Sequence, residues 1–253
     1  MADVLARDHA KLLLASAPQA LGDDMLDWLS CPLFVNRTSE WNSSRYKLLV
    51  FGQETCGWDF AMDETVSGME AHTLRHCISV PDAVDALGKH YAAFDLAECD
   101  SSIRRSPFWR AHRYLATRLE GGDYRKLLWT NLARCDASPL NESTAGVWNN
   151  FTYSNLDKIC SWQKDFAVEE LNASGAKAVI FFTGPNYDYI LERTFEDVRF
   201  HSVPGCGESE RVCSRVSGHC LPVASFRTYH PSYLSRSGRL SLLDALVEAI
   251  VKS

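Results

Sequence analysis

The sequence lacks the signals that would place a chain in a membrane. Its 253 residues contain no run approaching about 18 uninterrupted apolar residues, and no basic segment leads into an apolar stretch at the N-terminus. We therefore expect a soluble, cytoplasmic protein with no membrane partner. With 46% apolar residues the chain can bury a full core, so disorder is not expected.

Closely spaced cysteines are also missing. The chain has nine cysteines, an odd number, scattered in a way that favours reduced thiols over a disulfide framework. No N-terminal cysteine pair of the kind that holds an iron–sulfur cluster is present. The alternative of a zinc site on Cys206, Cys213 and Cys220 with His201 and His219 has a spacing unlike common zinc sites. We expect neither a metal nor a diffusible cofactor.

An overall excess of positive charge is absent too, since the formal net charge is −6. This argues against a protein coated with basic residues for nucleic-acid binding, although a local basic face remains compatible with an acidic body. Basic residues do gather between Arg211 and Arg239. Such a cluster is either a solvated surface or a contact for phosphates.

Apolar runs and helical periodicities alternate along the chain. Four short runs, 47–52, 127–131, 178–183 and 221–226, are typical of buried parallel strands. Helical patterns cover 4–15, 108–119, 155–171 and 240–250. We predict a three-layer α/β/α fold with a central four-stranded, mostly parallel sheet. It forms one domain over 1–253, with a helical N-terminal extension over about 1–45, and 201–220 is a long loop or hairpin.

Polar residues follow each predicted strand, where ligands bind in a parallel sheet. Glu54 comes two residues after Gly52, so it can act as a general base in a pocket, or it can cap a helix or lie on the surface. Asn131 ends the second run, and its amide can either recognise an amide-like edge of a ligand or satisfy loop backbone. We expect the residues after all four runs to converge on one site.

The segment after the fourth strand has the most distinctive sequence, Tyr229-His230-Pro231-Ser232-Tyr233-Leu234-Ser235. His230 precedes a proline and must be extended. Leu234 stands in a polar, basic stretch, so it either turns back into the core or is an exposed wedge that enters a base stack.

These segments resemble motifs of the uracil-DNA glycosylase superfamily. The segment 229–235 is similar to the His-Pro-Ser leucine loop of that family, and Gly52-Gln53-Glu54 to its Gly-Gln-Asp motif. Thr130-Asn131-Leu132-Ala133-Arg134-Cys135 resembles a Thr-Asn-Val-Val-Lys-Cys type of segment. The order and spacing fit over roughly 47–253, while the sharp motifs cover about thirty residues.

The resemblance implies an enzyme that extrudes a nucleotide from DNA and hydrolyses its N-glycosidic bond, leaving an abasic site. Leu234 is then expected to fill the vacated stack, while Ser232, Ser235 and Arg236 hold phosphates. DNA is the expected partner of a monomer with no obligatory protein partner.

The resemblance also assigns the base pocket. Asn131, beside Gln53, is expected to recognise the base edge. His230 hydrogen-bonds the departing base, and Glu54 positions water and stabilises the sugar cation.

A stacking platform for the base is expected from two places. Cys77-Ile78-Ser79-Val80 resembles the Cys-Phe-Ser-Val segment of the family, which places Ile78 against the base and Ser79 at the DNA. Trp58 is the other candidate platform.

Two departures from the family pattern concern the substrate. Glu54 replaces an Asp, which extends the carboxylate by about one methylene. Cys56 stands where uracil-specific enzymes carry a Tyr that blocks substituents on carbon 5, and the smaller side chain opens that wall. We therefore expect a C5-modified pyrimidine as substrate, such as glucosylated hydroxymethylcytosine in phage DNA, which would suit antiviral defence. The alternative is uracil excision in base excision repair.

Two other function classes remain open. One is a non-catalytic protein that binds a lesion or modified base, which Glu54 and His230 together argue against. The other is an unrelated α/β hydrolase, but the sequence has neither a Gly-x-Ser-x-Gly elbow nor a phosphate-binding Gly-x-x-x-x-Gly-Lys-Ser/Thr loop.

Overall fold

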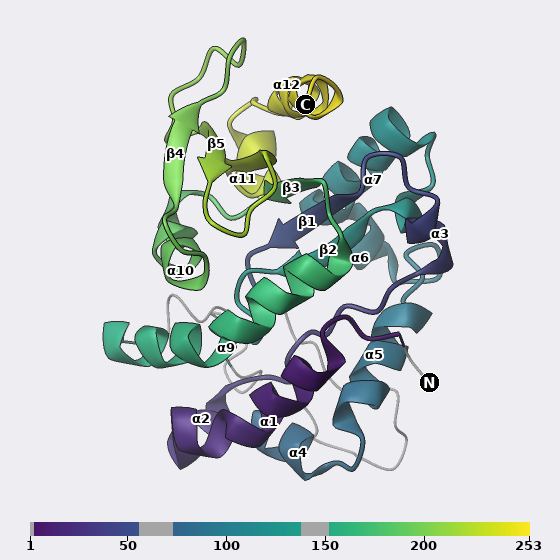
Figure 1. Ribbon diagram of the computed structural model, residues 1–253. Coiled ribbons are helices and arrows are strands. Elements are labelled where there is room, and N and C mark those ends of the chain that lie inside the picture. Colours follow the sequence, from purple (N-terminus) through teal and green to yellow (C-terminus); the bar gives the residue numbers. More distant parts are fainter. Residues whose placement is uncertain (1–2, 56–72, 138–151) are drawn as a thin grey trace.

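A six-stranded mixed sheet forms the centre of the protein in the computed structural model, which describes residues 3–55, 73–137 and 152–253 (Figure 1). The strands run in the order β2-β1-β3-β6-β5-β4. Their bounds are β1 (Leu48–Gly52), β2 (Leu128–Asn131), β3 (Ala178–Phe181), β4 (Arg199–Ser202), β5 (Cys213–Ser217) and β6 (Ala224–Thr228). The first four strands of this order are parallel, and β5 and β4 continue the sheet antiparallel.

The α/β class is confirmed, but the prediction of four strands is wrong. The stretch 201–220 supplies most of an antiparallel hairpin, β4–β5, that pairs with β6 and widens the sheet. No apolar run marks this hairpin, because every residue of β4 is exposed or only partly buried, and β5 alternates buried with exposed positions after Cys213 and Ser214. An antiparallel edge needs only one buried face, so its sequence differs from that of the central strands.

Helices cover both faces of the sheet (Figure 1). Strand residues alternate between two cores, with Leu49 and Phe51 in one and Leu48 and Val50 in the other. The first core is completed by α1 (Arg7–Leu21), α9 (Tyr153–Ser174) and α10 (Asp188–Thr194), and the second by α7 (Pro107–Glu120), α11 (Pro231–Arg236) and α12 (Leu242–Val251). The shorter helices are α2 (Asp23–Trp28), α3 (Ser39–Asn42), α4 (Leu74–Ser79), α5 (Ala83–Ala93), α6 (Ser101–Arg105), η2 (Tyr124–Lys126) and η3 (Pro185–Tyr187).

The N-terminal helices share the first core. Leu13 and Leu14 of α1 are buried there, and the indole of Trp162 on α9 donates a hydrogen bond to the carbonyl of Leu13 at 2.8 Å. Within the three described stretches, no helix combines the length and the apolar character needed to cross a bilayer.

A buried ion pair joins the end of β2 to α9. The guanidinium of Arg134 lies 2.5 Å from the carboxylate of Glu170, and neither side chain is exposed. Glu170 also accepts a hydrogen bond from the backbone N–H of Val35 at 3.1 Å and one from the hydroxyl of Thr130 at 3.3 Å. Burial raises the pKa of Glu170, and the positive charge of Arg134 opposes that shift. The pair therefore ties the N-terminal segment, β2 and α9 together.

Removing the charge of Glu170 alone should destabilise the protein strongly. Glu170→Gln keeps an oxygen acceptor for Val35 but leaves the guanidinium of Arg134 buried without a counter-charge, which typically costs about 3–5 kcal/mol. Adding Arg134→Met removes the stranded charge and should recover part of this loss. Urea unfolding at neutral pH measures both variants. Strictly additive losses in the double variant would contradict the pairing.

Candidate active site

A cavity of about 860 Å³ opens at the carboxyl edge of the parallel strands. Five residues singled out in the sequence line it, from three different strand ends: Gln53, Glu54, Asn131, His230 and Ser232. The parallel register explains why they meet, since Gly52 of β1 pairs with Asn131 of β2 and the neighbouring strands end at the same edge. The predicted convergence is found for these five residues.

Gly52 is required by the position of Asn131. A Cβ atom built on Gly52 would lie 2.3 Å from the Asn131 side-chain oxygen and 3.3 Å from the ring of Phe108. The missing side chain thus gives the Asn131 amide its place over β1. No hydrogen bond to the described residues fixes that amide, and it faces the cavity, so both its donor and its acceptor are available to a ligand.

The carboxylate of Glu54 is held from the next strand end. Tyr187, at the end of η3, donates its phenolic hydrogen to Glu54 Oε1. Burial and the adjacent charge of Glu54 raise the pKa of Tyr187, so its hydroxyl stays protonated and remains a donor. Gln53 is fixed similarly, because its amide nitrogen donates to the carbonyl of Thr183 at 2.9 Å.

His230 is held as a neutral imidazole with one defined tautomer. It is the N-cap of α11, and its Nδ1 accepts the backbone N–H of Ser232 at 3.2 Å. A backbone N–H can only donate, so Nδ1 is unprotonated and Nε2 carries the hydrogen. The hydroxyl of Ser232 lies 2.8 Å from the same nitrogen. Burial lowers the pKa of His230 from 6.5 to about 4, and the charge of Arg236 adds to the shift.

Aromatic rings that the sequence analysis missed form one wall of the cavity. Phe108 lies parallel to His230, with ring centroids 6.4 Å apart and planes at 12°, and it also approaches Gly52. Phe94, Trp109 and Trp129 line the cavity beside it. The available signal was Ser106-Pro107, an N-cap followed by a proline, which fixes the start of α7 and sets Phe108 at the cavity.

Polar and acidic residues also line the cavity. Asp95, Glu98 and Cys99 line it, together with His90 on α5. Asp95 is anchored by the hydroxyl of Tyr124 and by the backbone N–H of Ala97. The cavity therefore offers hydrogen-bond acceptors from the segment before α6 in addition to the residues at the strand ends.

The expected exposure of Leu234 is wrong. Its side chain is completely buried in the core formed with α7 and α12, because α11 turns it inward, whereas Tyr233 is 39% exposed. Ser235 and Arg236 are exposed on α11.

Ile78 was expected against the base and Ser79 at the DNA, but both lie on α4 and do not line the cavity. The hydroxyl of Ser79 instead donates a hydrogen bond to the carbonyl of His76 at 2.7 Å. Arg134, one of the residues expected to converge on the site, is buried behind it in the ion pair with Glu170. Cys56 and Trp58 lie outside the described residues.

No group of three or more metal-ligating side chains occurs among the residues whose structure is described. Cys206, Cys213 and Cys220, the cysteines of the alternative zinc site, are among these described residues and form no such group.

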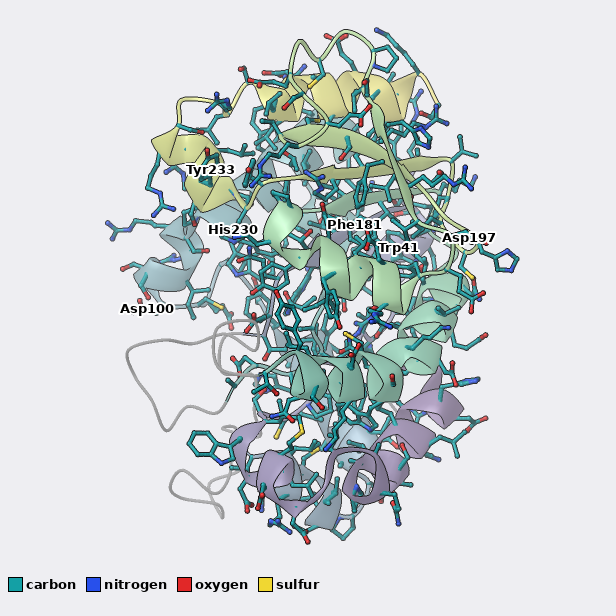
Figure 2. All side chains as sticks on the ribbon, turned by 90° about the vertical axis from the view of Figure 1, so that its left-hand side faces the viewer. Trp41, Asp100, Phe181, Asp197, His230 and Tyr233 are labelled. Atoms are coloured by element: carbon teal, nitrogen blue, oxygen red, sulfur yellow. The ribbon has the colours of Figure 1, made fainter. Side chains whose placement is uncertain are left out.

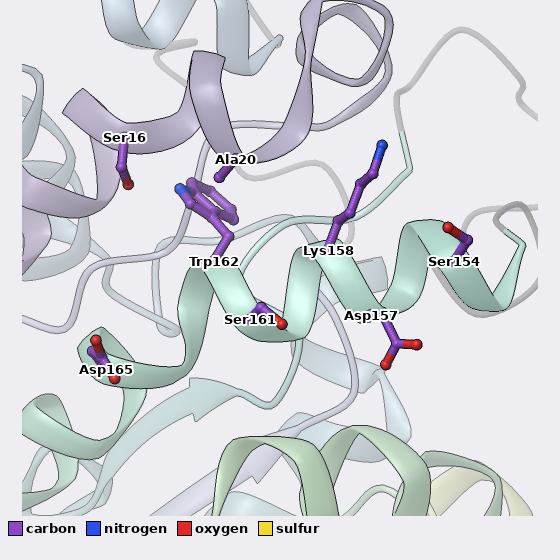
Figure 3. A pocket seen from close by; sticks show the side chains of 8 residues that line it. All are labelled: Ser16, Ala20, Ser154, Asp157, Lys158, Ser161, Trp162 and Asp165. Carbon is purple, nitrogen blue, oxygen red and sulfur yellow. The ribbon is translucent and has the colours of Figure 1, made fainter.

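A second hollow of about 560 Å³ lies between α1 and α9 (Figure 3). Ser16, Lys158 and Trp162 are among its lining residues, and none of the expected site residues contributes to it. Its polar side chains are partly engaged by the protein itself, since Asp157 accepts a hydrogen bond from Tyr189 and Trp162 donates to Leu13. The chemistry of the molecule therefore concentrates in the larger cavity.

Comparison of the chain with models of protein families, with curated proteins and with solved structures gives no match. The function is therefore inferred from the site itself.

The histidine geometry makes a prediction that needs no substrate. Nitrogen-15 NMR of the free protein should show the Nε2–H tautomer of His230 and a midpoint near pH 4. Because the pKa is lower in the folded chain, the stability that this group contributes is complete above pH 6.5 and is lost as the pH falls towards 4. Arg236→Gln should raise the midpoint. Titration near 6.5, or an Nδ1–H tautomer, would contradict this geometry.

Proposed function

We propose that the protein is a DNA glycosylase that removes a C5-modified pyrimidine. The observation that carries the proposal is the meeting of Glu54, Asn131 and His230 in one cavity at the carboxyl edge of the sheet. A carboxylate, an amide and a neutral imidazole are the groups that base recognition and glycosidic hydrolysis need.

The chemistry divides between two sides of the broken bond. The C–N bond breaks with its electron pair going to the base, which becomes anionic, while the sugar becomes cationic. His230 donates its Nε2–H to an oxygen of the departing base, and a neutral donor suits this role because it stabilises the negative charge without transferring a proton. Water held by Glu54 adds to the sugar carbon, and the proton it loses ends on the released base.

Recognition of the base falls to Asn131 and Phe108. The amide of Asn131 lies beside Phe108, so a planar ring bound there can meet hydrogen-bonding groups at its edge and an aromatic surface on its face. The wall of aromatic rings makes this part of the cavity suitable for a base.

The volume of the cavity supports a substrate larger than an unmodified base. Its 860 Å³ is towards the upper end of about 300–1,000 Å³ for whole small-molecule sites. The acceptors Asp95 and Glu98 in the lining match the hydroxyl donors of a sugar substituent. A glucosylated hydroxymethylcytosine, as in phage DNA, combines these features, and its removal would suit antiviral defence.

The test uses duplexes that differ only in the target base: glucosylated hydroxymethylcytosine, hydroxymethylcytosine, uracil or cytosine. Alkali then cleaves any abasic site. We expect breaks in the glucosylated duplex, reduced about 10²-fold or more by Glu54→Gln and by His230→Ala. Glu196→Gln and His201→Ala, on exposed side chains elsewhere, serve as matched controls.

Each outcome of this test has a defined meaning. Equal breakage by the wild type and both site variants would overturn the assignment of the site. Preferential cleavage of the uracil duplex would replace the modified base with uracil, and tight binding without breaks would indicate a protein that recognises the base without removing it.

Tyr187 is a positioning residue in this scheme. Tyr187→Phe removes the donor to Glu54, and a hydrogen bond to a charged group is worth about 1.5–3 kcal/mol. We expect kcat to fall about 10- to 100-fold with KM nearly unchanged, since the phenol acts on the carboxylate and not on the base. Single-turnover base release measures the effect. A change confined to KM would assign Tyr187 to substrate binding instead.

A further inference from the structure

The burial of Leu234 leaves the DNA-facing apolar side chain to be found elsewhere. Ile103 on α6 is 41% exposed and lines the cavity, which places it at the mouth. Tyr233 is the other exposed apolar residue of this region, but its ring already stacks on Tyr229 with centroids 4.2 Å apart. Ile103 is therefore the better placed of the two to enter another molecule.

Exposed arginines lie on the three helices that contribute Ile103, Phe108 and Ser232 to the cavity lining. Arg105 ends α6, Arg110 lies in the first turns of α7, and Arg236 lies in the last turn of α11, all exposed. None of these three forms an ion pair with the described residues, and the same is true of Arg199 on β4 and Arg215 on β5. The three differ from these in lying on helices that line the cavity, where an exposed positive charge suits an anionic partner.

The three arginines are called here the arginine rim. Arg105 directly precedes Ser106 and Pro107, which line the cavity, and Arg236 is close enough to His230 to affect its protonation. Figure 2 shows His230 between Asp100, the N-cap of α6, and Tyr233 of α11 along one side of the molecule. A rod-shaped polyanion that crosses this side would pass both α6 and α11.

We propose that the arginine rim binds the phosphates of duplex DNA and that Ile103 enters the space left by the extruded nucleotide. This inference rests on the proposed function for the role of Ile103. The rim itself predicts DNA binding whether or not a base is released.

The role of Ile103 is tested by comparing duplex with single-stranded DNA of the same sequence and target base. A side chain that fills a vacated stack matters only in a duplex. We expect Ile103→Ala to slow base release from the duplex about tenfold and from the single strand less than about twofold. Ile103→Leu should retain the duplex rate. Leu240→Ala, which truncates another residue that is 41% exposed, is the matched control. Equal losses on both substrates would overturn the wedge.

The arginine rim is tested by binding to a duplex that carries a stable abasic analogue, measured by fluorescence anisotropy over a range of salt concentrations. Each phosphate contact contributes about 0.9 to the slope of log K against log salt. Arg105→Gln, Arg110→Gln and Arg236→Gln should each reduce the slope by about that amount. Arg199→Gln, an exposed arginine on β4, should leave it unchanged.

The two measurements separate the failure of this inference from that of the proposed function. If the wild type releases the base but the rim variants keep the full salt slope, the assignment of the arginine rim is wrong and the proposed glycosylase function is retained. If the rim variants weaken salt-dependent binding but no duplex releases a base, the glycosylase function and the role of Ile103 are both contradicted, and the rim is a DNA-binding surface.

Discussion

Arg134 and Glu170 meet where no water reaches, and the geometry of the site depends on their contact. The guanidinium also lies near the rings of Phe51 and Phe166, so the charge has a carboxylate and two aromatic faces as its surroundings. Gln163 of α9 receives the backbone N–H of Arg134 at 3.1 Å and donates to the carbonyl of Leu132 at 3.0 Å. The turn after β2 is thereby fixed on both sides, and Asn131 takes its position from it.

The site separates charge in a useful way. Glu54 accepts a hydrogen bond from Tyr187, which favours the ionised form of the carboxylate, whereas His230 is desolvated and therefore neutral. Anionic and neutral groups can then face opposite ends of a bond that breaks into a cation and an anion. Burial keeps the imidazole of His230 neutral, and a hydrogen bond favours the ionised form of the Glu54 carboxylate. The two effects have different physical causes and are therefore independent of one another.

Much of this arrangement follows from the sequence. Apolar runs located the four parallel strands because such strands are buried on both faces, and the rule for parallel sheets brought Glu54, Asn131 and His230 together. The stretch 201–220 was expected to be a long loop or hairpin, but its strands were not counted in the sheet, because an exposed antiparallel edge leaves no apolar run. Leu234 could not be placed because a leucine in a polar stretch is compatible with either direction of a short helix. Ser106-Pro107 marks the start of the helix that carries Phe108 but not the cavity that it lines, and Tyr187 belongs to the site through a contact across the fold, which no local pattern encodes.

The tautomer of His230 has a consequence for molecules that are not substrates. A donor fixed at Nε2 attracts oxygen or an anionic nitrogen and repels an amino group, while the amide of Asn131 can present either of its ends by rotation about its last bond. The two positions therefore differ in tolerance, because His230 accepts only hydrogen-bond acceptors, whereas Asn131 accepts donors as well. An inhibitor for this cavity should carry a negative or carbonyl oxygen towards His230 and can vary freely in polarity where it meets Asn131.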